Sequence, residues 1–117
     1  MKISVVGIGR VGSTLAYTLV MRGLCDELLL INRRREIAEG DAHDLRHAVA
    51  FVDRQIEVNA GTIADSADSD VIALCASIPL QGHNTDRLAL GPGHNRTCSG
   101  SLCRNWQKTV PMPFLSY

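Results

Sequence analysis

The sequence has no excess charge of either sign, because twelve lysines and arginines balance twelve aspartates and glutamates. A nucleic-acid footprint needs a basic surface, so the balance argues against nucleic acid and against strongly acidic partners. The chain also has no apolar run near the length of a membrane span, and we expect no membrane contact. Lys2 precedes only a short apolar stretch before Gly7, which does not fit a signal peptide.

Cysteine is scarce and too scattered to form a disulfide framework. The four cysteines are Cys25, Cys75, Cys98 and Cys103. We therefore expect reduced thiols and a cytoplasmic protein. With 117 residues, the chain has room for one small domain with a core of ordinary size.

A glycine motif is what the sequence does have, directly after an apolar, β-branched stretch. Residues 2–6 fit a buried parallel strand, and apolar residues at helical spacing follow over residues 10–22. A glycine at the end of the strand permits a tight turn, the next admits a pyrophosphate, and the third lets the helix pack closely. The free amides of the helix start attract an anion. The predicted dinucleotide-binding residues are Gly7, Ile8, Gly9, Arg10, Val11 and Gly12.

Strands and helices alternate through the first 80 residues. After a helix that Gly23 ends, we predict a strand over 27–31, a helix over 34–49, a short strand over 56–59 that Gly61 breaks, and a strand over 70–76. This alternation predicts an α/β fold, a Rossmann-type doubly wound parallel sheet of about four strands. After Pro79 no periodicity is sustained, so an irregular C-terminal tail is expected.

The end of the second predicted strand bears on the choice of cofactor. NAD-binding folds usually place an acidic residue there to bind the ribose hydroxyls, whereas this chain has Asn32 followed by Arg33. A neutral amide does not repel a 2′-phosphate, and guanidinium groups bind phosphate well. We therefore expect NADP or NAD as cofactor, with NADP favoured. The alternative is a solvated basic turn that begins a helix.

Four blocks together resemble the amino-terminal, dinucleotide-binding half of the lactate/malate dehydrogenase family. The blocks are residues 5–13, 29–32, 39–48 and 68–79, and the resemblance covers about residues 2–90. It implies hydride transfer between a nicotinamide and a 2-hydroxy acid, and homo-oligomers in intact members. It adds Ala76 and Ser77 to the cofactor site. Asn32 and Ser77 depart from the family pattern, which has an acid and a glycine there.

The resemblance also implies a substrate loop after the fourth strand. Residues 81–94 are its expected remnant, and Arg87 is the one candidate for the family's substrate-binding arginines; Leu80-Gln81 stands in place of the other. An exposed arginine at a helix start is the alternative for Arg87. The family's catalytic histidine and aspartate belong to a carboxy-terminal domain outside this sequence, so we expect the chain alone to be inactive.

No metal site is expected. His43 and His47 are four residues apart on one helical face, but no third ligand lies near them, and a helix-surface role fits better. His94 with the last two cysteines matches no common zinc spacing. Asp41 and Asp44 fit a solvated helix face.

The last segment, residues 95–117, is rich in polar residues, glycine and proline, and its codons permit another interpretation. Read two nucleotides later, they allow S-D-L-F-R-E-L-V-P-E-L-A-K-D-C-P-D-A-V-L-V-I, an amphipathic helix, a turn and a β-branched strand, as in the family. We therefore expect a frame-shifted tail, with a divergent end as the alternative.

Two other functions compete with a dehydrogenase fragment. A non-catalytic nucleotide-sensing module of the potassium-uptake regulator type also opens with M-K-I-x-x-x-G-x-G-R-V-G, and a damaged gene would give a product without function. The blocks at 39–48 and 70–79 favour the dehydrogenase.

Overall fold

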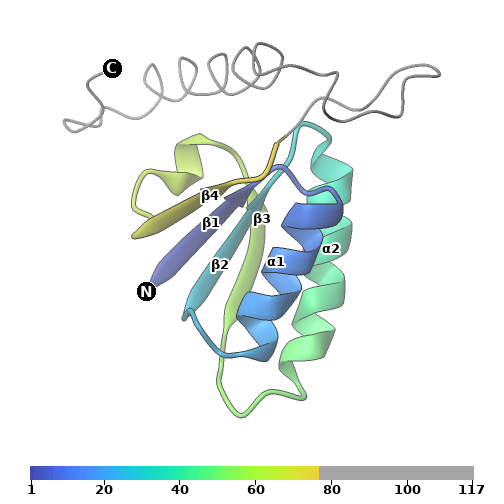
Figure 1. Cartoon of the computed structure of the whole chain (residues 1–117), viewed down its shortest axis with the longest axis vertical. Coiled ribbons are helices and arrows are strands. Elements are labelled where there is room, and N and C mark those ends of the chain that lie inside the picture. The colour runs from blue at the N-terminus through green and yellow to red at the C-terminus, as the bar shows by residue number, and fades with distance from the viewer. Residues whose placement is uncertain (77–117) are drawn as a thin grey trace, which may run out of the picture. The chain divides into compact units, whose positions relative to one another are not determined.

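The computed structural model of the chain describes residues 1–76, and Met1–Cys75 form one compact unit. Four strands make a single parallel sheet in the order β3-β2-β1-β4 (Figure 1). The strands are β1 (Lys2–Val6), β2 (Glu27–Ile31), β3 (Glu57–Gly61) and β4 (Val71–Leu74). The predicted Rossmann-type parallel sheet of four strands is confirmed. The predicted tail lies outside the described residues.

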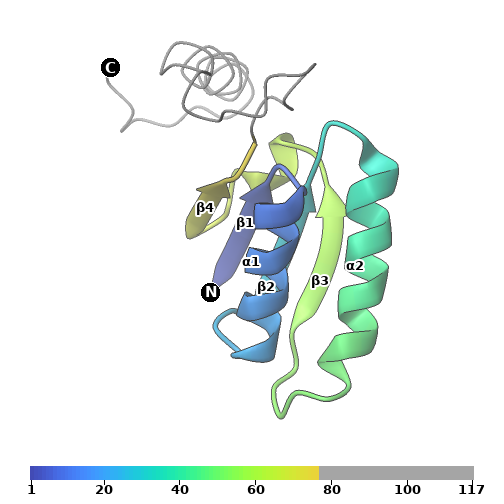
Figure 2. The same cartoon turned by 45° about the vertical axis from the view of Figure 1, so that its right-hand side comes forward.

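Two helices connect the first three strands and cover the same face of the sheet. Helix α1 (Arg10–Met21) joins β1 to β2, and α2 (Arg35–Val49) joins β2 to β3; Figure 2 shows the two packed side by side. Their small and apolar residues pack on the inward side chains of the strands, as the alternation of a sheet requires. The buried core cluster comprises Ile3, Val5, Ile8, Ala16, Leu19, Val20, Cys25, Leu28, Leu30, Ala38, Ala42, Leu45, Ile56 and Val58.

Helix α1 ends where the glycine signal predicts. Gly23 has a φ of 61°, and its N–H donates to the Val20 carbonyl at 3.0 Å, while the Leu24 N–H donates to the Leu19 carbonyl at 3.0 Å. This pair of bonds is a Schellman motif, which satisfies the last carbonyls of the helix. The helix itself stops at Met21, one residue before the predicted end.

The third strand corrects the prediction for Gly61. The strand begins at Glu57 and includes Gly61, which pairs with Ile31 of β2, so this glycine does not break it. A Cβ at this position would lie 2.8 Å from an Asp65 carboxylate oxygen and 2.9 Å from Leu29 Cδ1. The glycine is therefore needed for close packing at the end of the strand.

Three smaller differences concern element bounds. The second helix begins at Arg35 because Arg34 is extended, with φ −95° and ψ 105°. The last strand is Val71–Leu74, shorter than the predicted 70–76. A short 3-10 helix, η1 (Ala64–Ser66), precedes it and was not predicted. None of these differences changes the order or direction of the strands.

Side chains and backbone of β1 contact the segment between β3 and β4 through hydrogen bonds and an ion pair. The Lys2 N–H donates to Asp70 at 2.7 Å, Lys2 Nζ lies 2.6 Å from Asp68 and 3.2 Å from Glu27, and the hydroxyls of Ser4 and Ser69 are 2.6 Å apart. These contacts fix η1 and the start of β4 beside β1. No helix within residues 1–76 has the length and apolar character to cross a bilayer. The cytoplasmic location stays a prediction.

Candidate functional site

The glycine motif leaves the carboxyl end of β1 through a tight turn. Gly7 has a φ of 95°, a conformation that side chains disfavour, and its N–H donates to the Ile31 carbonyl of β2 at 2.8 Å. The turn brings the chain directly to the start of α1. The tight turn predicted at Gly7 is confirmed.

Gly12 packs against the turn itself. A Cβ at Gly12 would lie 2.1 Å from the Gly7 carbonyl oxygen and 3.6 Å from Cys75 Cβ. Only glycine lets α1 approach the turn this closely, whereas the distance to Cys75 is an ordinary van der Waals contact. The close packing predicted for this position is confirmed, and the atom that demands it is a backbone carbonyl.

Gly9 has the opposite surroundings, because a Cβ there would meet nothing within 4 Å. Gly9 is the N-cap of α1; no side chain caps the helix, and none of the residues in its own first turn is acidic. The first amides of α1 are therefore available to a ligand and carry the positive end of the helix dipole. This open helix start suits an anion such as a pyrophosphate.

The other predicted loop residues divide by exposure. Arg10 and Val11 are exposed beside the open helix start. Ile8 is 5% exposed and belongs to the hydrophobic core. A contact between Ile8 and a ligand is thus limited to its backbone.

Asn32 and Arg33 follow β2 at the same edge of the sheet, because Val6 and Ile31 are register partners. Asn32 is half-buried, with its Nδ2 3.4 Å from the Arg34 carbonyl, and Arg33 is exposed. Arg35 forms an ion pair with Glu39 at 2.7 Å. Among the ion pairs of residues 1–76, none involves Arg33 or Arg34. Helix α2 also starts without a side-chain cap.

The fourth strand completes this edge. The Cys75 N–H donates to the Val6 carbonyl at 2.8 Å, so the carboxyl end of β4 lies beside the carboxyl end of β1, where the glycine loop begins. The strand order reverses between β1 and β4, since β2 and β3 lie on one side of β1 and β4 on the other. In open parallel sheets, ligands bind at such a reversal, outside the carboxyl ends of the strands. Ser77 and Arg87 lie outside the described residues.

A contact between the two helices was missed by the sequence analysis. The Ser13 hydroxyl, in the first turn of α1, donates to the Asp41 carboxylate of α2 at 2.5 Å. Asp41 is half-buried, so the interpretation as a solvated residue is wrong for it, whereas Asp44 is exposed as expected. No local pattern identifies the partner, because the two residues are 28 positions apart.

The paired histidines of α2 lie on its surface. The rings of His43 and His47 have centroids 4.4 Å apart and meet edge to face, and both residues are exposed. In the described part of the chain, no group of three or more His, Cys, Asp or Glu side chains is placed to hold a metal ion.

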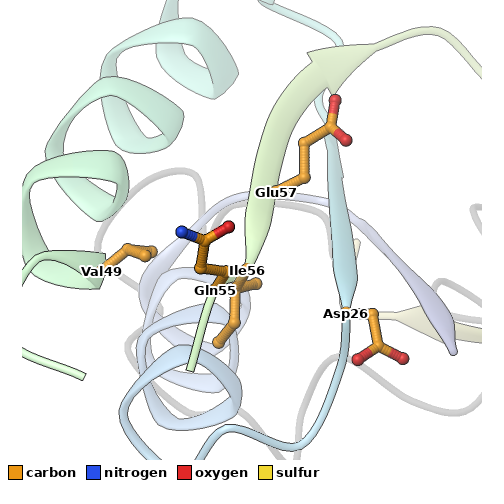
Figure 3. Close-up of a pocket in the computed structure, with 5 residues that line it drawn as sticks. All are labelled: Asp26, Val49, Gln55, Ile56 and Glu57. Carbon is orange, nitrogen blue, oxygen red and sulfur yellow. The ribbon is translucent and has the colours of Figure 1, made fainter. Parts of the chain in front are cut away.

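A pocket lies at the other end of the sheet, next to the amino ends of β2 and β3 (Figure 3). Its lining residues are Asp26, Val49, Gln55, Ile56 and Glu57. Asp26 is engaged by the N-terminal ammonium and by Arg54 at 2.8 Å, and these two hydrogen bonds lower its pKa. This pocket is therefore remote from the glycine loop, and one of its two acids, Asp26, is already ion-paired.

Comparison with known proteins identifies the family. Residues 1–110 match the family model described as lactate/malate dehydrogenase, NAD binding domain. The chain is 43% identical over 75 residues to L-lactate dehydrogenase 3 of Bacillus cereus, which covers 64% of this chain and 24% of that protein. It is 39% identical over 79 residues to the L-lactate dehydrogenase of Staphylococcus haemolyticus, 68% of this chain and 25% of that protein.

Solved structures agree. The minor L-lactate dehydrogenase of Enterococcus mundtii in a ligands-bound form superposes with a TM-score of 0.81 at 30% identity, over 92% of this chain and 34% of that one. Malate dehydrogenase of Archaeoglobus fulgidus in complex with NADH superposes with a TM-score of 0.79 at 29% identity. This match covers 95% of this chain and 37% of that one.

The matched region spans about a quarter of the length of the curated relatives. These matches support a dehydrogenase and give no support to a nucleotide-sensing module of the potassium-uptake regulator type. The chain belongs to the lactate/malate dehydrogenase family and corresponds to its NAD-binding domain.

Proposed function

We propose that the chain binds a nicotinamide dinucleotide at the carboxyl edge of the sheet, as the cofactor half of a 2-hydroxy-acid dehydrogenase. The observation that carries the proposal is the open start of α1. Gly9 leaves space in front of uncapped amides, and Gly12 allows the helix to pack closely against the turn at Gly7. The relatives named above are lactate and malate dehydrogenases, one of them in complex with NADH.

Two glycines with equally open surroundings allow a matched test of this site. A Cβ would meet nothing within 4 Å at Gly9 or at Gly40, which lies in the middle of α2. Gly9→Glu places a carboxylate where the pyrophosphate is to bind, so we expect NAD+ binding measured by calorimetry to be lost. Gly40→Glu adds the same charge elsewhere and should leave the Kd unchanged. Equal binding by both variants contradicts the proposed site.

NADP(H) is the proposed preferred form of the cofactor. Asn32 brings no negative charge to the ribose site, Arg33 and Arg34 have no acidic partner within residues 1–76, and α2 begins there without a cap. A 2′-phosphate would gain charge-assisted hydrogen bonds from these groups, each worth about 1.5–3 kcal/mol. The comparisons themselves name NAD as the family's ligand.

The cofactor preference is tested by the ratio of the Kd values for NAD+ and NADP+. We expect the unmodified chain to bind NADP+ about tenfold more tightly, an energy of about 1.4 kcal/mol. Asn32→Asp should reverse the order, because its carboxylate repels the 2′-phosphate and accepts from the ribose hydroxyls. Arg35→Ala is the control, since Glu39 already engages Arg35. A clear preference of the unmodified chain for NAD+ refutes the role of Asn32 and Arg33.

Arg87 is the proposed substrate-binding residue, and Ala76 and Ser77 are proposed to belong to the cofactor site. Arg87 would neutralise the carboxylate of a 2-hydroxy acid, the substrate class of the family. Because that contact forms with substrate and not with cofactor, Arg87→Ala should leave the Kd for NAD(P)+ unchanged. Residues 1–80, 81–94 and 95–117 remain the proposed division of the chain into cofactor domain, loop remnant and tail.

Self-association is also part of the proposal, through the outer face of α1. Val11, Tyr17 and Met21 are 67%, 52% and 41% exposed. Between them, the hydroxyls of Thr14 and Thr18 donate to carbonyls one turn earlier in the helix. No charged side chain occurs from Val11 to Met21, so this face has few groups that hydrogen-bond to water. Sedimentation should show species larger than a monomer that Tyr17→Lys reduces.

A further inference from the structure

Ser13 connects the glycine loop to the second helix. Its N–H donates to the Gly9 carbonyl at 2.9 Å, which closes the first turn of α1, and its hydroxyl donates to Asp41 at 2.5 Å. The opposite end of the loop is held by the bond from the Gly7 N–H to the Ile31 carbonyl. The loop is thus anchored to β2 at its start and to α2 at its end.

The negative charge of Asp41 bears on how the Ser13–Asp41 hydrogen bond can affect the binding of an anion. A short hydrogen bond from a hydroxyl to a carboxylate is among the stronger hydrogen bonds of proteins. A carboxylate at the first turn of an anion-binding helix nevertheless opposes the anion through its charge. An acceptor at this place can therefore help ligand binding only through the geometry that it imposes, since its negative charge acts against the anion.

We propose that Asp41 is a positioning residue for the dinucleotide pyrophosphate, acting through Ser13 on the amides of Arg10, Val11 and Gly12. Held by Asp41, the first turn of α1 presents these amides in a fixed direction, and the ligand need not order them on binding. This inference rests on the proposed function. It concerns a residue that touches neither loop nor ligand and that the glycine motif does not include.

The test compares two ligands that differ in the pyrophosphate. ADP carries it and adenosine does not, so a positioning role predicts that only ADP binding changes. In the 117-residue chain, Ser13→Ala and Asp41→Ala should each raise the Kd for ADP about five- to tenfold, with no further rise in the double variant. The Kd for adenosine should stay the same. Asp41→Asn keeps an acceptor oxygen and removes the charge, so it should bind ADP nearly as well as the unmodified chain.

Asp44→Ala is the matched control, because it removes an exposed acid from the same helix, three residues further on. It should leave both Kd values unchanged. As a second measurement, the amide NMR resonances of residues 9–12 should shift without ligand in Asp41→Ala and not in Asp44→Ala.

Three outcomes count against the inference, and they are distinguishable. An unchanged Kd for ADP in Asp41→Ala overturns the positioning role alone. Equal losses of ADP and adenosine binding indicate a general weakening of the domain and also overturn it. Failure of the unmodified chain to bind ADP, NAD+ and NADP+ overturns the proposed function and this inference with it.

Discussion

Glycines of one motif serve different physical purposes here. Gly7 is required for its positive φ, Gly12 for the closeness of the Gly7 carbonyl, and Gly9 for the open space that it leaves. The first two requirements belong to the fold, and the third belongs to the proposed ligand site. Substitutions at these positions should therefore separate stability from binding.

Gly12→Ala should destabilise the domain. Its methyl carbon would lie 2.1 Å from a backbone oxygen, and a backbone atom cannot move aside as a flexible side chain can. Overpacking of this kind costs about 1–3 kcal/mol, and a contact this short places the variant at the upper end. Denaturant unfolding measures the loss.

Gly40→Ala is the counterpart on α2. The position is helical, exposed and open, so alanine should stabilise the domain by about 0.5–1 kcal/mol.

The prediction for Gly12 is contradicted if Gly12→Ala is as stable as the unmodified chain. That result would show that the turn and α1 separate readily.

How much of the site the sequence reveals depends on how local each requirement is. The turn at Gly7 and the close packing at Gly12 are properties of six consecutive residues, and the motif predicts them. The bond between Ser13 and Asp41 depends on how two helices pack, and Asp41 lies on the same helix as the exposed Asp44, only three residues before it. Sequence pattern alone cannot separate these two aspartates.

At the scale of elements, the bounds of β1 and β2 were predicted correctly, whereas the apolar β4 is shorter than predicted. β1 and β2 have the predicted bounds because their runs of aliphatic residues are buried on both faces. β3 is half polar, and its extent is set by pairing with β2 and by the space at Gly61. The 3-10 helix η1 is held by the hydrogen bond from Lys2 Nζ to the Asp65 carbonyl, a tertiary contact that no local sequence pattern predicts.

The attachment of η1 and β4 to β1 predicts how stability depends on pH. The hydrogen bond from Lys2 lowers the pKa of Asp68 below its ordinary value of 3.8. The pKa of Asp65 is also lowered, chiefly by the hydrogen bond from the Thr62 N–H and then by that from the Thr62 hydroxyl. A carboxyl group with a lowered pKa stabilises the fold above its unfolded pKa and loses that effect as pH falls through the folded value. The melting temperature should therefore decrease as the pH is lowered below about 4.

Asp68→Asn isolates this contribution. At neutral pH the variant should melt below the unmodified chain, and the two melting temperatures should converge as the pH falls below 3.8. Asp53→Asn, an exposed acid without an ion pair in the described residues, should follow the unmodified chain throughout. A deficit of Asp68→Asn that is the same at pH 3 and pH 7 would mean that its ion pair with Lys2 contributes nothing.

At the scale of the molecule, the core is built early in the chain. Among the described residues 1–76, the buried cluster lies between Ile3 and Val58, and the strand pairing occurs between Lys2 and Leu74. Helices α1 and α2 cover only one face of the sheet, and the edge strand β4 has Val71 and Leu74 exposed. The stability of this unit should thus be set by residues 1–76.

The final prediction concerns residues 95–117, which we propose to be out of frame. A segment that was not selected to pack should contribute nothing specific, so a version ending at Leu90 should match the full chain in unfolding free energy within about 0.5 kcal/mol. A version carrying the other reading frame should gain a helix and a strand, bury apolar surface, and be more stable by several kcal/mol. Denaturant unfolding and limited proteolysis of the three versions measure this. A full chain clearly more stable than the version ending at Leu90 shows that the tail packs specifically, which contradicts the frameshift.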